Sequence, residues 1–151
     1  MQDTKILRVA VSGSSGQLGN EFTRIAGNHP GFHFTFLTRE VFPLDQEEKM
    51  LVWLKENPVD IFIHCAAYTA VDKAESDKEN TFLLNGSASG SIASVLSEKG
   101  AKLIYISTDY VFDGKSATPL TEEAETNPIN VYGASKLEGE KLVLKNNPLT
   151  Q

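Results

Sequence analysis

A tyrosine and a lysine, Tyr132 and Lys136, stand four residues apart near the end of the sequence. Positions i and i+4 face the same way on a helix, so the phenol and the ammonium can lie side by side. A neighbouring ammonium lowers the pKa of a phenol through its charge and through hydrogen bonding. Such a tyrosine can give or take a proton at a sugar or alcohol oxygen. The spacing alone does not distinguish a proton-transfer pair from an ordinary exposed tyrosine and lysine, because helices present many such pairs.

A glycine turn follows the first apolar run of the chain. Its pattern is G-x-x-G-x-x-G, which differs from the G-x-G-x-x-G of the common dinucleotide fingerprint. Small residues allow the backbone to approach a pyrophosphate, and a helix N-terminus offers free N–H groups and a positive dipole end. A tight turn without a ligand is the alternative, but the position between a strand and a helix favours a cofactor site. The residues expected there are Gly13, Gly16, Gln17, Leu18 and Gly19.

The end of the second predicted strand reads Leu37-Thr38-Arg39. A carboxylate at this place hydrogen-bonds the ribose hydroxyls of NAD, whereas an arginine accommodates the 2′-phosphate of NADP. Thr38 and Arg39 are therefore expected to contact the ribose of NADPH. The alternative is that Arg39 is a solvated surface residue, which the adjacent Glu40 favours. In that case NADH remains possible as the cofactor.

Short β-branched runs alternate with helical patterns along the whole chain. This alternation predicts an α/β fold with a Rossmann-like, doubly wound parallel sheet and right-handed crossovers. Asp45 is expected to cap the second helix with Glu48 as its capping-box partner, and Asn130 to cap the last helix. Ligands of such sheets bind beyond the carboxyl ends of the strands. The strands are expected at 6–11, 32–37, 59–65 and 101–107.

Length and composition narrow the classes of function. The 151 residues suffice for one domain, which we expect to span 1–151. The net charge of −6 and the lack of a basic run argue against nucleic-acid binding. With no targeting signal and no apolar run of membrane-spanning length, a cytoplasmic protein that does not contact membranes is expected. The single cysteine, Cys65, is expected to be a buried structural thiol.

Four segments together resemble the extended short-chain dehydrogenase/reductase superfamily and, within it, the dTDP-4-dehydrorhamnose reductase family. They match in order and spacing, and they cover nearly the whole chain. The two middle segments are much more specific than a glycine turn or a YxxxK pair. The matching segments are 13–19, Cys65-Ala66-Ala67-Tyr68-Thr69-Ala70-Val71-Asp72-Lys73-Ala74-Glu75, Ser107-Thr108-Asp109-Tyr110-Val111-Phe112-Asp113-Gly114 and Asn130-Val131-Tyr132-Gly133-Ala134-Ser135-Lys136-Leu137-Glu138-Gly139-Glu140.

The resemblance implies an oxidoreductase of dTDP-rhamnose biosynthesis that uses NADPH to reduce a dTDP-4-keto-6-deoxy sugar. Tyr132 would protonate the C4 oxygen, while Lys136 would depress the pKa of Tyr132 and bond the nicotinamide ribose. Thr108 would bond the substrate oxygen, with Asp109 close to the sugar. In addition, Ala66, Ala67 and Tyr68 would pack along the cofactor, and Asp45 would approach the adenine.

The chain also departs from the family. Family members are about twice as long, so the further C-terminal strands and the small substrate domain are expected to be absent, as in a truncated or unusually short form with weak or no turnover. An open sheet edge would then invite association. The resemblance leaves a homodimer open and points to Glu21 as a Mg²⁺ ligand, but one carboxylate is not a metal site.

Two other functions remain open from the sequence. One is a non-catalytic regulatory module like the β subunit of methionine adenosyltransferase, which carries a similar Asp-Tyr-Val-Phe-Asp-Gly segment, because fold and motif do not fix function. The other is a nucleotide-sugar epimerase that recycles its NAD. The Tyr68 segment favours the reductase over the first, and Arg39 disfavours the second.

Overall fold

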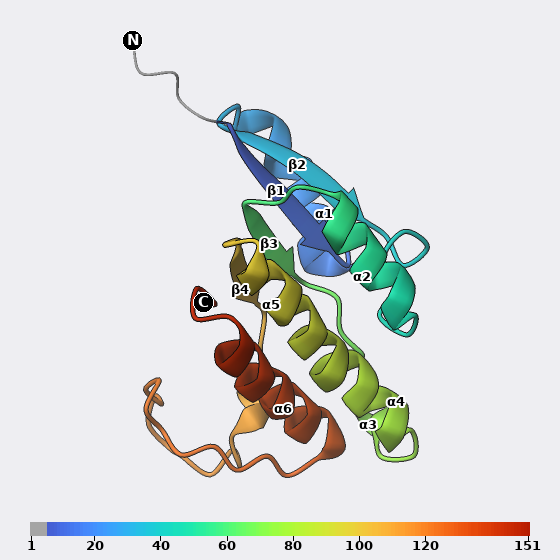
Figure 1. Ribbon diagram of the computed structural model, residues 1–151. Coiled ribbons are helices and arrows are strands. Elements are labelled where there is room, and N and C mark those ends of the chain that lie inside the picture. Colours follow the sequence, from blue (N-terminus) through green and yellow to red (C-terminus); the bar gives the residue numbers. More distant parts are fainter. Residues whose placement is uncertain (1–5) are drawn as a thin grey trace.

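The computed structural model describes residues 6–151 as four parallel strands with helices on both faces (Figure 1). The sheet has the order β2-β1-β3-β4. Its strands are β1 (Leu7–Ser12), β2 (Phe32–Leu37), β3 (Ile61–His64) and β4 (Lys102–Tyr105). The crossovers leave β1 in opposite directions, toward β2 and then back to β3, which creates a switch point between β1 and β3. The expected α/β, Rossmann-like fold is confirmed.

The helices lie between and after these strands. The helix α1 covers one face, whereas α2, α5 and α6 lie side by side on the other (Figure 1). A π-helical segment, Leu83–Ser87, joins α4 to α5 in one continuous rod. The helices are α1 (Gln17–Ile25), α2 (Glu47–Glu56), α3 (Val71–Ala74), α4 (Lys78–Phe82), α5 (Ala88–Glu98) and α6 (Val131–Asn146), with short 3₁₀ turns η1 (Ala26–Asn28) and η3 (Asp109–Val111).

Strand register brings the four carboxyl ends to one edge of the sheet. Ser12 pairs with Leu37 of β2 and with His64 of β3, and His64 pairs with Tyr105 of β4. The loops that follow these residues therefore start at the same level. The alternation of strands and helices in the sequence predicted that these loops converge, and the observed strand register places them together.

The main core lies between the sheet and the α2–α5–α6 layer. Phe62 and Leu103 project from the sheet, and Met50, Leu54 and Ile92 meet them from the helices; all five are completely buried. A smaller cluster around Val9, Val11 and Ile63 fills the α1 face. Because both faces of the sheet are buried, the strands have nearly continuous apolar sequences.

Two cap predictions have different outcomes. Asn130 caps α6 as expected, since its Oδ1 accepts a hydrogen bond from the Gly133 N–H at 2.7 Å. The Asp45 capping box is wrong: α2 begins at Glu47 after Gln46, with no side-chain cap. Asp45 instead accepts a hydrogen bond from Arg39, because a cation at the end of β2 competes for its carboxylate.

The outer edge of β4 is not wholly open at its carboxyl end. The Gln151 N–H donates to the Leu103 carbonyl at 2.8 Å, and the Gln151 carbonyl accepts from the Tyr105 N–H at 2.9 Å. These two bonds have the parallel-ladder pattern. Within residues 6–151 no helix is both long and apolar enough to cross a bilayer.

A buried histidine, His64, makes the fold sensitive to acid. It lies 2.6 Å from the Ser12 hydroxyl and 3.2 Å from that of Ser89. Burial, and secondarily the charge of Lys136, lower its pKa from 6.5 to about 3. The unfolded chain therefore binds a proton that the folded chain does not, and stability is lost as the pH falls from the ordinary histidine pKa toward that value.

We expect the free energy of unfolding to fall by about 2 kcal/mol more in the wild type than in His64→Gln between about pH 6.5 and pH 5, at about 1.4 kcal/mol per pH unit. Urea unfolding at a series of pH values measures this difference. His33→Gln, at an exposed position, is the matched control and should keep the wild-type slope. Equal slopes for wild type and His64→Gln would contradict a neutral buried histidine.

Candidate active site

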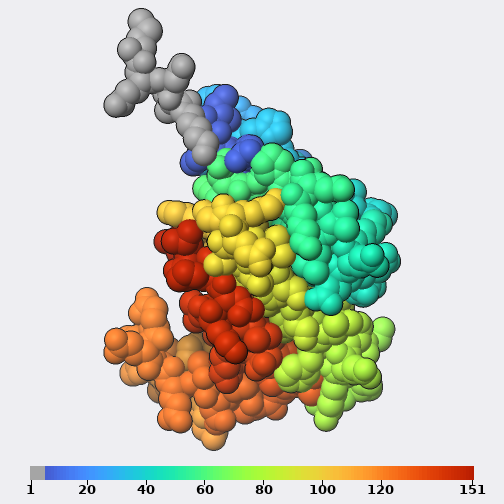
Figure 2. All heavy atoms as spheres, viewed as in Figure 1, coloured from blue at the N-terminus to red at the C-terminus, as the bar shows by residue number. Residues whose placement is uncertain are grey.

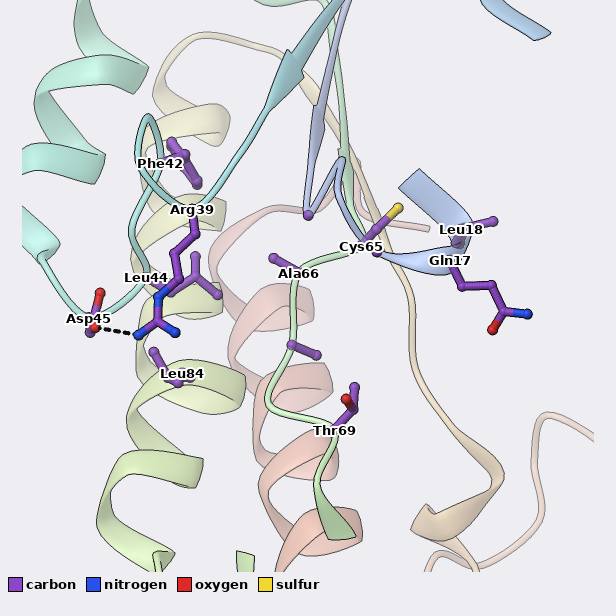
Figure 3. A pocket seen from close by; sticks show the side chains of 13 residues that line it. Gln17, Leu18, Arg39, Phe42, Leu44, Asp45, Cys65, Ala66, Thr69 and Leu84 are labelled. Carbon is purple, nitrogen blue, oxygen red and sulfur yellow. Dashed lines mark hydrogen bonds and ion pairs between the residues drawn. The ribbon is translucent and has the colours of Figure 1, made fainter. Parts of the chain in front are cut away.

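A cavity of about 570 Å³ opens at the carboxyl edge of the sheet, beside the switch point. The glycine turn forms one wall and the segment after β2 forms the opposite wall, with Ala66 and Thr69 between them (Figure 3). Eight of the expected cofactor residues line it, namely Gly13, Gly16, Gln17, Leu18, Arg39, Asp45, Ala66 and Ala67. Figure 2 shows the outer surface of the molecule, from which the loop of residues 112–130 stands out next to α6.

Gly13 shapes the floor of the cavity. Its φ of +68° is a conformation that side-chain-bearing residues rarely adopt, and an added Cβ would lie 2.7 Å from the Ala66 nitrogen. The Gly16 N–H bonds back to the Gly13 carbonyl at 2.9 Å, so the turn is tight and leads directly into α1. This turn suits a pyrophosphate, because no side chain caps the N-terminus of α1 beside the cavity.

Arg39 and Asp45 form an ion pair at the opposite wall, with 3.0 Å between the Arg39 Nη2 and the Asp45 Oδ2 (Figure 3). The Arg39 side chain is 80% exposed. A pair this exposed contributes little to stability, so the guanidinium keeps its capacity to bind an anion. The position suits a phosphate on the 2′ oxygen of a ribose.

Five of the expected cofactor residues lie outside the cavity lining: Tyr132 and Lys136 are on α6, and the other three are Gly19, Thr38 and Tyr68. Gly19 packs against the backbone of the glycine turn, where a Cβ would overlap Ser14 at 2.6 Å. The Thr38 hydroxyl donates to the Glu40 carboxylate at 2.7 Å, and this bond lowers the pKa of Glu40. Tyr68 is held by its backbone to Asn85. These residues support the lining rather than form it.

Sequence reasoning missed part of the cavity wall. Phe42, Leu44 and Leu84 supply an apolar surface close to Arg39 (Figure 3). Phe42 and Leu44 flank a proline in a segment without periodicity, so no pattern marked them. The expected burial of Cys65 is only half right: the thiol packs on Val9, Val11 and Ile63, but the residue also lines the cavity. Burial raises the pKa of this thiol to about 11, which makes it a poor nucleophile.

Lys136 is buried against the end of β4. Its Nζ donates to the Ile106 carbonyl at 2.6 Å and lies 3.9 Å from the centre of the Tyr105 ring. Burial lowers the pKa of Lys136 to about 8, while the charge of Glu140 acts in the opposite direction. Most of the amine is therefore charged at neutral pH. An ammonium has three donors, and the contact with Ile106 uses one of them.

Thr108 and Tyr132 reach the same region from different elements. Thr108 caps η3, since its hydroxyl accepts from the Tyr110 N–H at 3.3 Å, and it donates to the Asp109 carboxylate at 3.2 Å. The rings of Tyr110 and Tyr132 pack edge to face with centroids 5.6 Å apart. The turn that carries Thr108 and Asp109 is thereby seated on the first turn of α6, which carries Tyr132.

Asn85, which sequence reasoning did not single out, connects these parts from inside the core. Its Oδ1 accepts from the Tyr68 N–H at 2.7 Å, and its Nδ2 donates to the Tyr68 carbonyl at 3.1 Å and to the Ser135 hydroxyl at 2.9 Å. Ser135 in turn donates to the Tyr132 carbonyl at 2.7 Å. One buried amide therefore ties the loop after β3 to α6.

We expect Asn85→Ala to lower the free energy of unfolding by about 3 kcal/mol, because it removes three hydrogen bonds, leaves the Tyr68 N–H and carbonyl without their partner and opens a small cavity in the core. Asn80→Ala, which removes a single partly buried bond to Asp77, should cost about 1 kcal/mol or less. Urea midpoints of the two variants check the comparison. Equal losses of unfolding free energy in the two variants would show that the amide of Asn85 does not hold the loop after β3 to α6.

Glu21 lies on the outer surface of α1, where it pairs with Arg24 at 2.7 Å. Among residues 6–151 no cluster of three histidine, cysteine, aspartate or glutamate side chains could hold a metal ion.

The parallel sheet, the glycine turn at its switch point and the cavity define a Rossmann-like α/β domain. The chain belongs to the family described as RmlD substrate binding domain, which matches residues 7–150. It is 39% identical over 142 residues to a dTDP-4-dehydrorhamnose reductase of Sinorhizobium fredii and 37% identical over 140 residues to one of Burkholderia thailandensis, covering 94% and 91% of this chain.

Solved structures agree with this assignment. The dTDP-4-dehydrorhamnose reductase of Bacillus anthracis in complex with NADP superposes over 95% of this chain with a TM-score of 0.90 and 33% identity. The chain covers 47% and 45% of the two curated relatives and 51% of the Bacillus anthracis structure. It thus spans about half the length of the proteins that it matches.

Proposed function

We propose that this chain carries the cofactor site and the proton donor of a reductase that converts dTDP-4-dehydro-L-rhamnose to dTDP-L-rhamnose with NADPH. The observation that supports this most is the cavity itself, in which the glycine turn and Arg39 face each other across the switch point. The similarity to reductases, one of them solved with NADP, supports the same assignment.

The cofactor would lie across this cavity with its pyrophosphate at Gly13 and Gly16 and its 2′-phosphate at Arg39. When bound, NADPH supplies the hydride that reduces the ketone carbon. Phe42, Leu44 and Leu84 offer an apolar wall near Arg39, which suits an adenine. Ala66 and Ala67 allow close approach of the chain to the remainder of the dinucleotide.

The protein groups supply orientation and a proton. Tyr132 gives its phenolic proton to the C4 oxygen of the sugar, and the Thr108 hydroxyl turns from Asp109 to donate its hydrogen bond to the same oxygen. The ammonium of Lys136 favours the phenolate that remains and offers a donor to the nicotinamide ribose. Because the chain spans about half the length of its relatives, we expect these residues alone to turn over slowly.

The cofactor assignment is tested by fluorescence titration with NADPH and NADH. We expect wild type to bind NADPH at least about tenfold more tightly than NADH, a difference of about 1.4 kcal/mol. Arg39→Ala should lose this preference and leave NADH affinity nearly unchanged. Lys49→Ala, which removes an exposed cation bonded to the Glu40 carbonyl, is the charge-matched control. Equal losses of both cofactors in Arg39→Ala would rule out the 2′-phosphate contact.

A further inference from the structure

Glu140 lies one helical turn beyond Lys136 on α6, at the end of the family-like segment 130–140. The proposed reaction assigns no role to this residue. Its Oε1 accepts a hydrogen bond from the Ser107 hydroxyl. Ser107 belongs to the strand-end segment Ile106–Thr108, which the proposed reaction uses through its last residue. A carboxylate on α6 thus contacts the residue next to Thr108.

The same segment is held by α6 at a second point. Lys136 donates to the Ile106 carbonyl at 2.6 Å, one residue before Ser107. Successive residues of the segment are therefore bonded to successive turns of α6. Two attachments fix both the distance and the rotation of the segment relative to the helix, which a single bond cannot do.

The charge of Glu140 also acts on Lys136, and the other groups that face this ammonium do not offset it. His64 faces it from β3 and stays neutral at neutral pH, because burial lowers its pKa to about 3. Tyr105 faces it from β4 and also stays neutral, because burial raises its pKa. The Tyr132 phenol lies one turn earlier on α6. Burial lowers the pKa of Lys136, and Glu140 raises it.

We propose that Glu140 is a positioning residue of the site, which anchors the Ile106–Thr108 segment to α6 and keeps the amine of Lys136 charged. This inference rests on the proposed function in one respect: the proposed reaction uses Thr108 and Lys136, the two groups that Glu140 would position. The anchoring and the electrostatic effect are properties of the chain without cofactor or substrate.

Two variants separate the charge from the hydrogen bond. Glu140→Gln keeps an acceptor for Ser107 and removes the charge, whereas Ser107→Ala keeps the charge and removes the bond. Glu138→Gln is the matched control, because it removes the same charge from an exposed position two residues earlier on the same helix. All three positions lie at or near the surface, where substitutions are well tolerated.

The charge is tested by following the ¹³Cε resonance of Lys136 through a pH titration of the chain alone. Glu140→Gln should lower the pKa of Lys136 by about half a unit to one unit, a size typical of a neighbouring charge near a protein surface. Ser107→Ala and Glu138→Gln should leave the pKa of Lys136 within about 0.2 units of wild type. Equal values for Glu140→Gln and Glu138→Gln would overturn the electrostatic part of the proposal.

The anchor is tested by amide hydrogen exchange in η3, whose Phe112 N–H bonds to the Asp109 carbonyl at 3.0 Å. Ser107→Ala and Glu140→Ala should speed exchange of this amide about fivefold or more, and Glu138→Gln should not change it. Unchanged exchange in Ser107→Ala and Glu140→Ala would overturn the anchoring part. Neither measurement uses NADPH or turnover, so failure of the proposed function would leave both results interpretable.

Discussion

Replacing Tyr132 by phenylalanine is expected to slow formation of dTDP-L-rhamnose by about a hundredfold or more, because a positioned general acid contributes about 10²–10⁴ in rate. The substitution removes one hydroxyl and keeps the ring that packs on Tyr110. NADPH affinity should stay within about threefold, since the cavity walls at the glycine turn and Arg39 are untouched. Single-turnover assays with protein in excess over dTDP-4-dehydro-L-rhamnose measure this rate.

The control is Tyr110→Phe, which removes a hydroxyl from the partner ring, 44% exposed. It should keep at least about half of the wild-type rate, since surface substitutions away from reacting groups have small effects. If Tyr132→Phe retained the rate of Tyr110→Phe, Tyr132 would not be the proton donor.

Replacing Gly139 by alanine is expected to lower the free energy of unfolding by about 2 kcal/mol. A Cβ at this position of α6 would overlap both the Tyr105 hydroxyl and the Asn85 carbonyl, which are hydrogen-bonded to each other at 3.1 Å. Alanine is the better helix former by about 1 kcal/mol. Overpacking against backbone costs about 1–3 kcal/mol or more and therefore decides the sign.

Gly27→Ala is the matched control, because nothing lies within 4 Å of a Cβ added there. It should be neutral or slightly stabilising, through lower entropy of the unfolded chain. Urea unfolding of both variants gives the comparison. A stable Gly139→Ala would mean that α6 does not lie as close to β4 and Asn85 as the structure places it.

Alternation of short apolar runs with helical patterns was enough to predict the fold class and the edge of the sheet at which the candidate cavity opens. Periodicity located every strand end to within about two residues, and both ends of β2 without error. The Asp45 cap failed for a reason that lies outside local sequence. A capping signal competes with any cation that the fold brings near, and here the fold brings Arg39.

Packing also explains the composition of the segment that joins α4 to α5. The run of small and polar residues from Asn85 to Gly90 is a weak helix former by propensity. In the fold it faces α6: Gly86 lies against Glu138, and Gly90 lies against Leu142. Asn85 is buried and hydrogen-bonded to both the N–H and the carbonyl of Tyr68 in the loop after β3. Partners distant in sequence determine these residues, so no local pattern could predict their role.

An amide chemical-shift map of the ¹⁵N-labelled chain with NADPH tests the central claim most directly. We expect the largest shifts on residues 13–17, Arg39 and residues 66–67, with further shifts in the first turns of α6 around Lys136. Residues of a smaller cavity of about 200 Å³ at the other end of the strands, such as Arg8 and His33, should not move. Absence of saturable shifts, or shifts centred on Arg8 and His33, would contradict the assignment of the cofactor to this cavity.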